Sequence, residues 1–373
     1  MNLTRLVMAI CICIVGERSL AQSSPQLPPQ SQPQTQPELQ TLSAQEFLHR
    51  MGNATTLAMT GRTLSGDQVK ELEKKVHDDP DDIDSRTQLL GHYFMGARSA
   101  RSDRETHAGH VLWLIEHRPE AGILATPFGE IMSSFVPKQY SKAHDLWLKQ
   151  CESHFQNLVI INNAVCFFKS ADRKQAIELL TKAQTLDPEN THWHEALGKL
   201  LLTVAKLPAG DQQTAIDALS ALEKSLVGID PMSRFYKLSD VAKAALLAGN
   251  PDKARQYANE LLQMALEVGR DWNYGNAVHH GNLVLGHVAL LDGNMEAAEA
   301  YLLKAGQTPG SPQLNSFGPN MQLAKELLEL KRTKAVLEYF DLCAKFWNRP
   351  ELAKWKADVE IGRIPKFGGN LMY

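Results

Sequence analysis

The chain has 373 residues, of which 43% are hydrophobic and 7% aromatic, enough to form a large core or a long row of smaller ones. Its formal net charge at pH 7 is −3. This balance lacks the basic excess that draws proteins to nucleic acid or to anionic membranes, so nucleic acid is not an expected partner.

Residues 1–21 have the features of a signal peptide. Arg5 provides a positive charge, an apolar run covers 6–15, and the sequence Ser-Leu-Ala at 19–21 places small residues before the expected cleavage site. Because a membrane-spanning helix needs about 20 apolar residues, the short run favours cleavage after Ala21 over a retained anchor. We therefore expect an exported protein, periplasmic or secreted, with no integral membrane segment after cleavage.

Cleavage would leave three cysteines, Cys151, Cys166 and Cys343, an odd number for an oxidising compartment. If Cys151 ends one helix and Cys166 lies well inside the next, antiparallel helix, the two are offset by about 10 Å along the helix axis. This offset exceeds the roughly 7 Å between α-carbons that a disulfide can bridge. We therefore expect buried free thiols.

Residues 22–42 form a segment rich in glutamine and proline, with seven Gln and five Pro between 22 and 40. Such a composition has too little apolar surface to offset the entropy lost on ordering. It favours an inert, flexible linker over a tether or a binding strip for a partner.

Helical signals begin directly after this linker. Capping boxes at 43–46 and 65–68 each precede apolar residues at helical spacing, and 82–98 has the Leu-Gly-x-x-Phe pattern of a repeat's first helix. Its partner helix is expected near 107–119, and a degenerate unit at 124–153. With no run of alternating β-branched residues, the chain is expected to be all-α, and 43–156 to hold divergent N-terminal helical repeats.

The acidic run at 78–84 could suggest a calcium site, but it lacks the central glycine and the closing glutamate of an EF-hand loop. Aspartates are also favourable before and within the first turn of a helix. We expect this run to mark helix starts.

Small residues recur at fixed offsets through the middle of the chain. Three sets are separated by 7 and then by 5 positions: Ala164, Ala171 and Ala176; Ala242, Gly249 and Ala254; and Gly286, Gly293 and Ala298. A small residue in one helix lets a second helix approach closely, and turn residues between them stop one helix and cap the next. Each unit is expected to be a helical hairpin that buries its apolar face only by stacking on neighbours. In the last set, Gly286 should admit the second helix of its own hairpin, Ala298 should accept a neighbouring helix, and His287 should face outward.

These hairpins resemble the tetratricopeptide repeat (TPR) family, whose units of about 34 residues combine two helices with a closing proline. The best matches are 157–190 and 279–310. A further unit opens at 191 and has an insertion around 207–210 before its second helix, and another opens at Phe235 with a long second helix through Glu267. The resemblance implies an α-solenoid of TPR-like antiparallel helical hairpins, wound into a right-handed superhelix. We expect the repeat region to cover 157–350, with a further helical pair at 318–347 and about seven hairpins in the chain.

Residues 351–373 are expected to form a C-terminal capping tail, because the stretch from Val359 is too rich in glycine and proline for another repeat. We expect the tail to fold back over the last helix and to bury Ile364, Phe367 and Tyr373. A recognition tail is the alternative.

Histidines are the first candidates for chemistry, since the chain has 13. Three groups suggest a metal centre: His107 and His110, His192 and His194, and His279 and His280 followed by His287. None of them has the His-x-x-x-His spacing, and no cysteine or carboxylate stands beside them at a recognised ligand spacing. The pattern favours surface or groove histidines over a metal site, and no cofactor is expected.

Motifs for catalysis are also missing from the sequence, which has no G-x-S-x-G, P-loop, G-x-G-x-x-G or H-E-x-x-H. Cys166 lies on an apolar helix face, without the electropositive setting of a catalytic thiol. The sequence therefore does not indicate an enzyme.

The resemblance implies that first helices line a concave wall that binds a protein or an extended peptide. The wall positions that it implies are His92, His192, Glu195, Lys199, Tyr236, Lys243, His280 and His287. The unit at 157–190 carries Ile161 and Val165 where chaperone-binding relatives carry Lys and Asn, so that ligand class is not indicated. The leading hypothesis is a non-enzymatic exported scaffold. The alternative is an exported helical enzyme or metal-binding protein that uses groove histidines.

Overall fold

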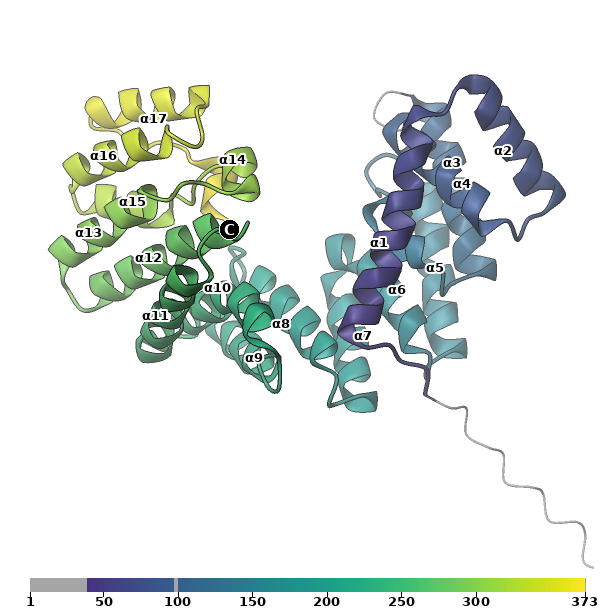
Figure 1. Cartoon of the computed structure of the whole chain (residues 1–373), viewed down its shortest axis with the longest axis horizontal. Helices are drawn as coiled ribbons and strands as arrows, with labels where there is room; N and C mark the ends of the chain where they lie inside the picture. The colour runs from purple at the N-terminus through teal and green to yellow at the C-terminus, as the bar shows by residue number, and fades with distance from the viewer. Residues whose placement is uncertain (1–38, 97–99, 373) are drawn as a thin grey trace, which may run out of the picture. The chain divides into compact units, whose positions relative to one another are not determined.

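The computed structural model describes residues 39–96 and 100–372, and the chain is all-α there, as predicted. Seventeen α-helices follow one another in these ranges, without a strand (Figure 1). None of these helices combines the length and the hydropathy of a membrane-spanning segment. The predicted signal peptide at 1–21 and most of the predicted linker lie outside the described residues.

The first two helices begin at the predicted capping boxes. At the start of α1 (Ala44–Thr60) and of α2 (Gly66–Asp78), a serine side chain accepts a hydrogen bond from the backbone N–H three residues later. The side chain of that later residue accepts a hydrogen bond from the serine backbone N–H. The acidic run precedes α3 (Ile83–Gly96), where Asp82 accepts a 2.9 Å hydrogen bond from the backbone N–H of Ser85. This contact confirms the prediction that the run marks a helix start. The expected partner of α3 is α4 (Arg101–His117).

The region 124–153 holds one α-helix, so the degenerate repeat predicted there is wrong. Two short 3-10 turns, η2 (Gly122–Ala125) and η3 (Pro127–Gly129), precede the single helix α5 (Pro137–Ser153). Proline has no backbone N–H to donate to a helical hydrogen bond, and it disfavours the helical conformation of the residue before it. Two prolines about ten residues apart therefore leave no room for a first helix.

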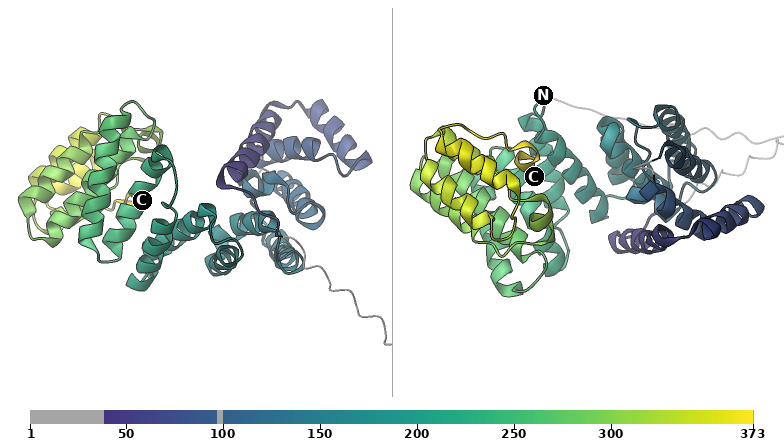
Figure 2. Two further views of the ribbon diagram at one scale, coloured as in Figure 1. Left: turned by 60° about the horizontal axis from the view of Figure 1, so that its bottom comes forward. Right: turned by 90° about the horizontal axis from the view of Figure 1, so that it is seen from above.

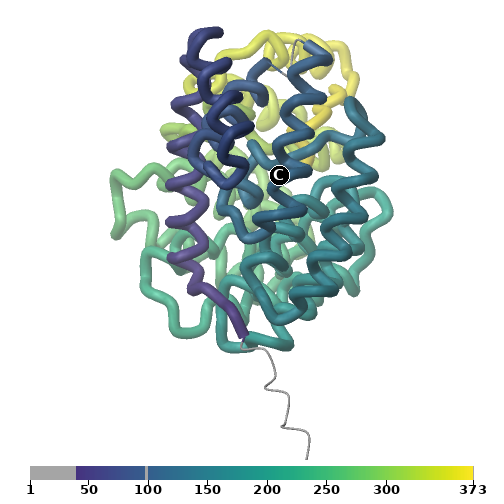
Figure 3. Tube along the Cα trace, turned by 90° about the vertical axis from the view of Figure 1, so that its right-hand side faces the viewer, coloured from purple at the N-terminus to yellow at the C-terminus, as the bar shows by residue number. Residues whose placement is uncertain are grey.

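From residue 158 the helices pair into hairpins as predicted (Figure 2). The pairs are α6 (Leu158–Ala171) with α7 (Arg173–Leu186), α8 (Thr191–Ala205) with α9 (Gln212–Lys224), α10 (Pro231–Leu247) with α11 (Pro251–Val268), α12 (Tyr274–Leu291) with α13 (Met295–Gly306), and α15 (Gln322–Glu329) with α16 (Thr333–Cys343). Two single helices, α14 (Pro312–Phe317) and α17 (Pro350–Glu360), complete the described fold. With α3 and α4 there are six hairpins in the described ranges, where about seven were predicted. Figure 3 follows the same succession along the Cα trace.

The predicted small residues lie where helices pack closely. Ala242, Ala254 and Ala298 are fully buried, and Gly249 and Gly293 hold φ values of +72° and +73° in the turns between paired helices. Each hairpin therefore uses its small residues as the spacing indicated.

Gly286 admits the predicted helix α13 and also α15 of the next hairpin. A Cβ added there would lie 2.3 Å from the Leu323 side chain on α15, but 3.4 Å from Tyr301 on the paired helix α13. The closest approach is thus to the next hairpin, because α12 packs against both.

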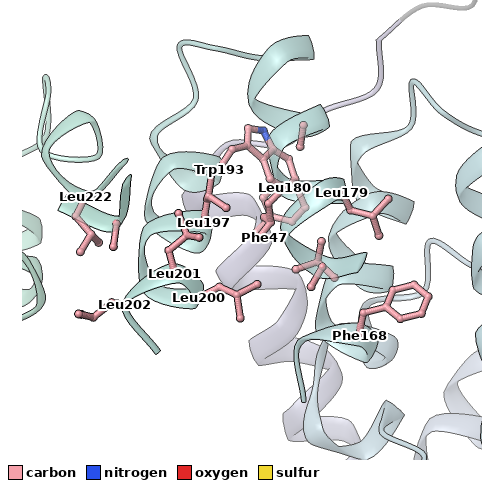
Figure 4. Packing of buried hydrophobic residues seen from close by; sticks show 14 of the residues in the cluster. Phe47, Phe168, Leu179, Leu180, Trp193, Leu197, Leu200, Leu201, Leu202 and Leu222 are labelled. Carbon is pink, nitrogen blue, oxygen red and sulfur yellow. The ribbon is translucent and has the colours of Figure 1, made fainter. Parts of the chain in front are cut away.

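The N-terminal helix α1 is part of the core of the repeat region. Phe47 from α1 meets Trp193 of α8 edge to face at 5.3 Å, beside Leu180 of α7 (Figure 4). The residues before α1 are also bonded, since the backbone N–H of Leu158 donates to the Gln40 carbonyl at 2.7 Å. Residues 39–42 therefore do not belong to the flexible linker predicted for 22–42.

The C-terminal tail begins later than predicted and buries fewer side chains. Helix α17 occupies 350–360, and after it Phe367 is 2% exposed and packs on Trp355 at 5.1 Å, as expected. Ile364 is 43% exposed, so its predicted burial is wrong; it lines a surface pocket beside Trp355. Tyr373 lies outside the described residues.

Asn370 fastens the end of this tail to the segment after α14. Its side-chain amide donates to the carbonyls of Phe317 and Pro319, and its own carbonyl accepts from the backbone N–H of Met321. The tail therefore reaches back to the start of the last hairpin, which brings Leu371 and Met372 next to helices that are distant in sequence.

Candidate binding site

Two adjoining pockets lie along the first helices α10 and α12. The larger has a volume of about 520 Å³ and lies between the end of α8, α10, α12, α15 and the C-terminal tail. The smaller, of about 380 Å³, lies between α10, α12 and α14. Lys243 and His280 line both, so the pockets are two parts of one candidate site.

Four of the eight predicted wall residues come together here. Lys243, His280 and His287 line the larger pocket, and Tyr236 lines the smaller. They share a surface because α10 contacts both α8 and α12, so that the first helices of three successive hairpins are neighbours. The repeat spacing thus predicted a real grouping of side chains.

His192, by contrast, packs against α1 and lines neither pocket. Its ring stacks on Phe47 at 4.4 Å between centroids, and its Nε2 pairs with the Asn162 side-chain oxygen at 2.9 Å. Burial lowers the pKa of His192 to about 4. A helix distant in sequence therefore packs against the wall position predicted for His192, which remains partly exposed.

Glu195 and Lys199 bind each other on α8. The Lys199 ammonium donates to Glu195 at 2.5 Å, and Lys237 of α10 pairs with the other carboxylate oxygen at 2.7 Å. The Lys199 side chain remains half exposed, while both carboxylate oxygens of Glu195 form ion pairs with ammonium groups. Neither residue lines the two pockets.

His92 lies apart from the other predicted wall residues. It is on α3, where its ring meets Tyr93 at 5.2 Å, and it lines neither pocket. Sequence spacing placed it on a first helix correctly, but that helix belongs to the N-terminal hairpin.

The larger pocket carries positive charge without a matching partner. In the described part of the chain, the ammonium groups of Lys206 and Lys243 have neither an ion pair within 4.0 Å nor a hydrogen bond, although Asp240 lies near enough to favour their charged forms. Burial lowers the pKa of Lys206 and lowers that of Lys243 to about 8, against the opposing effect of Asp240.

Two further polar atoms at this place have no hydrogen-bond partner within the described ranges. They are Nδ1 of His280 and the hydroxyl of Ser239, both buried. Burial and the two nearby lysines hold the pKa of His280 well below its usual value, so the ring is neutral. Buried polar groups are usually hydrogen-bonded, which makes this group of atoms a candidate for ligand contact.

His287 lies in the wall of the larger pocket and does not point freely outward as predicted. Its Nδ1 pairs with Glu326 of α15 at 2.9 Å, and Gln322 donates to the other oxygen of that carboxylate at 2.8 Å. Both oxygens of the Glu326 carboxylate, which brings negative charge to this side of the pocket, therefore already have hydrogen-bond partners.

The remaining candidate histidines have structural partners. His279 is fully buried, with Nδ1 donating to the Ala305 carbonyl and Nε2 accepting from the backbone N–H of Asn320, each at 3.1 Å. His107 pairs with the Phe128 carbonyl at 2.8 Å, and His110 with Glu73 at 3.1 Å. Among the residues that the structure describes, no three His, Cys, Asp or Glu side chains are placed to hold a metal ion.

The residues of the site that sequence reasoning missed include Lys206, Ser239, Trp272 and Phe317. Trp272 and Phe317 lie in or next to the connections between repeats, where the family pattern assigns no wall position. Lys206 follows directly after the last residue of α8, next to the insertion that interrupts this repeat. That insertion was the available signal, whereas nothing in the sequence distinguishes Ser239.

Comparison of the sequence with protein-family models and with curated proteins gives no match. The function proposed below therefore rests on the residues of this chain.

Proposed function

We propose that this protein is a non-enzymatic, exported scaffold that binds a protein or an extended peptide along α8, α10 and α12. We also propose that its hairpins form a right-handed, tetratricopeptide-like solenoid. The succession of hairpins with neighbouring first helices supports the fold, and the signal-like residues 1–21 support export.

An exposed aromatic cluster on the smaller pocket carries the proposal. Tyr236 and Trp272 stack at 5.3 Å between ring centroids, and Phe317 lines the same pocket. Their exposed fractions are 37%, 51% and 68%. Large aromatic side chains are enriched in the buried centres of protein interfaces, where they supply much of the binding energy. Next to Lys243 and His280, the cluster offers a partner both apolar and polar contacts.

Affinity capture with crosslinking tests this surface. The wild-type protein should recover a specific partner from the native envelope or secreted fraction, and the W272A/F317A variant should lose it. Phe155→Ala is a matched control, since Phe155 is also exposed, at 41%, but does not line the site. Equal recovery by W272A/F317A, with an unchanged thermal midpoint, would show that this surface is not where the partner binds.

The alternative function, an exported enzyme or metal-binding protein, is favoured by one observation. His280 has an unpartnered Nδ1 within the described ranges and shares the larger pocket with His287. It predicts that the purified protein contains stoichiometric zinc, which H280A/H287A should lose. A wild-type protein without bound metal would exclude the metal-binding alternative.

A further inference from the structure

The larger pocket combines unpaired positive charge at one end with an apolar wall at the other. We propose that it binds a small organic monocarboxylate with an aliphatic tail, with the carboxylate at Lys206 and Lys243 and the tail along the leucines of α10 and α12. This inference goes beyond the proposed function, because it holds whether or not a protein binds the aromatic cluster.

The charged end lacks the acceptors that its donors require. Lys206 and Lys243 are half-buried at the pocket without an ion pair or a hydrogen bond to the described part of the chain, and the buried Nδ1 of His280 has no partner there either. Withdrawing an ammonium group from water without a partner costs free energy. A bound carboxylate would supply acceptor oxygens to both lysines, and charge-assisted hydrogen bonds of this kind are among the strongest in proteins.

The charges facing this place favour an anion. Lys206 from the end of α8 and Lys243 from α10 bring two positive charges, and Asp240 from α10 brings one negative charge that also acts on Lys199 of α8. On α12, His280 is neutral, and on α15 the Glu326 carboxylate is bonded to His287 and Gln322. Positive charge is therefore in excess, and a carboxylate would reduce this excess.

The apolar end fits an aliphatic chain. The wall there is made by Leu246, Leu247, Leu283, Val284, Leu290 and Leu291, and the tail residues Leu371 and Met372 extend it. Leu291 is 65% exposed and Met372 44% exposed, so apolar surface faces water in the empty pocket. The volume of about 520 Å³ lies in the range of roughly 300–1,000 Å³ that small-molecule sites occupy.

Calorimetric titration of the full mature protein at pH 7 tests the proposal with probes of one chain length. Octanoate should bind with one site per chain, 1-octanol at least tenfold more weakly, and octyltrimethylammonium not at all. Hexanoate should bind roughly tenfold more weakly than octanoate, because each buried CH₂ contributes about 0.8 kcal/mol. Octanoate affinity should also fall between pH 7 and pH 9, as Lys243, with a pKa of about 8, loses its charge.

Substitutions of the two lysines locate the carboxylate. K206M/K243M should bind octanoate at least tenfold more weakly than the wild type and octanol equally well. Lys174→Met, at an exposed lysine on α7, should leave both affinities unchanged. The single variant K243Q should weaken octanoate binding at least threefold and remove its decline above pH 7.

The stability of K206M/K243M provides a second readout. Because the two ammonium groups make no ion pair or hydrogen bond within the described ranges, their removal should leave the thermal midpoint unchanged or raise it. The proposal is overturned if octanol binds as tightly as octanoate or if K243Q keeps the wild-type affinity. It is overturned equally if the midpoint falls, since the lysines would then serve the fold, or if a blocked acidic peptide binds this pocket and octanoate does not.

Discussion

At the scale of single residues, burial decides what the histidines can do. His107, His192 and His279 each have a pKa lowered to about 4 because the surrounding protein withdraws the ring from water. Each ring also has a hydrogen-bond partner in the protein. These side chains act as neutral polar groups that are bonded within the fold.

Acid should destabilise the protein through these histidines. Their folded-state pKa lies below the unfolded value of about 6.5, so the unfolded state binds more protons between pH 6.5 and pH 4. The stability present above pH 6.5 is therefore lost as the pH falls through this window, by at most about 1.4 kcal/mol per pH unit for each histidine. Urea unfolding at pH 7 and pH 5 should give a smaller difference for His279→Gln than for the wild type. An equal difference in the two proteins would contradict this account of His279.

At the scale of helices, small residues set how closely the hairpins pack. Ala298 of α13 is fully buried, and its partner helix α12 and the hairpin of α15 and α16 lie against the same helix. The offsets of 7 and 5 positions between small residues therefore predict where helices pack closely, which the residue types alone would not.

Ala298→Leu should lower the free energy of unfolding by roughly 1–3 kcal/mol, because the added side chain overpacks a close helix contact. Ala300→Leu is the matched control, since Ala300 is exposed on the same helix and the same residue is introduced. Denaturant unfolding of both variants measures the difference. A loss in A300L as large as in A298L would mean that the effect does not arise from packing.

The helical elements were largely predictable, because capping, periodicity and turn chemistry act over a few neighbouring residues. The boxes before α1 and α2 and the pairs from α6 onward follow from such local signals. The failures have longer-range causes. Prolines 127 and 137 leave a single helix where a repeat unit was expected, and the packing of α1 over His192 joins segments far apart in sequence.

At the scale of the whole molecule, the described residues form a succession of hairpins whose first helices are neighbours from α8 to α12. Spacing between repeats therefore predicted that Tyr236, Lys243 and His280 would share a surface. It could not predict Trp272 or Phe317, since residues between repeats reach the site only through tertiary packing. Residues from outside the repeat pattern complete the site.

Disulfides should play no part in the stability of the mature chain. Cys151, Cys166 and Cys343 are free, and Cys151 and Cys343 are buried, as predicted, whereas Cys166 is half-buried. Burial raises the pKa of each thiol, that of Cys151 to about 12. In the chain that begins at Gln22, a reducing agent should leave the thermal midpoint unchanged. A thiol-specific disulfide reagent should react slowly with the native protein and with three thiols after denaturation in guanidinium chloride. A midpoint that falls on reduction would require a disulfide bond in solution.

The attachment of the C-terminal tail through Asn370 has a practical consequence for every binding measurement on this protein. Leu371 and Met372 line the larger pocket, so a purification tag fused to the C-terminus would start within a few residues of the pocket wall. Such a tag could block the site or supply its own side chains to it.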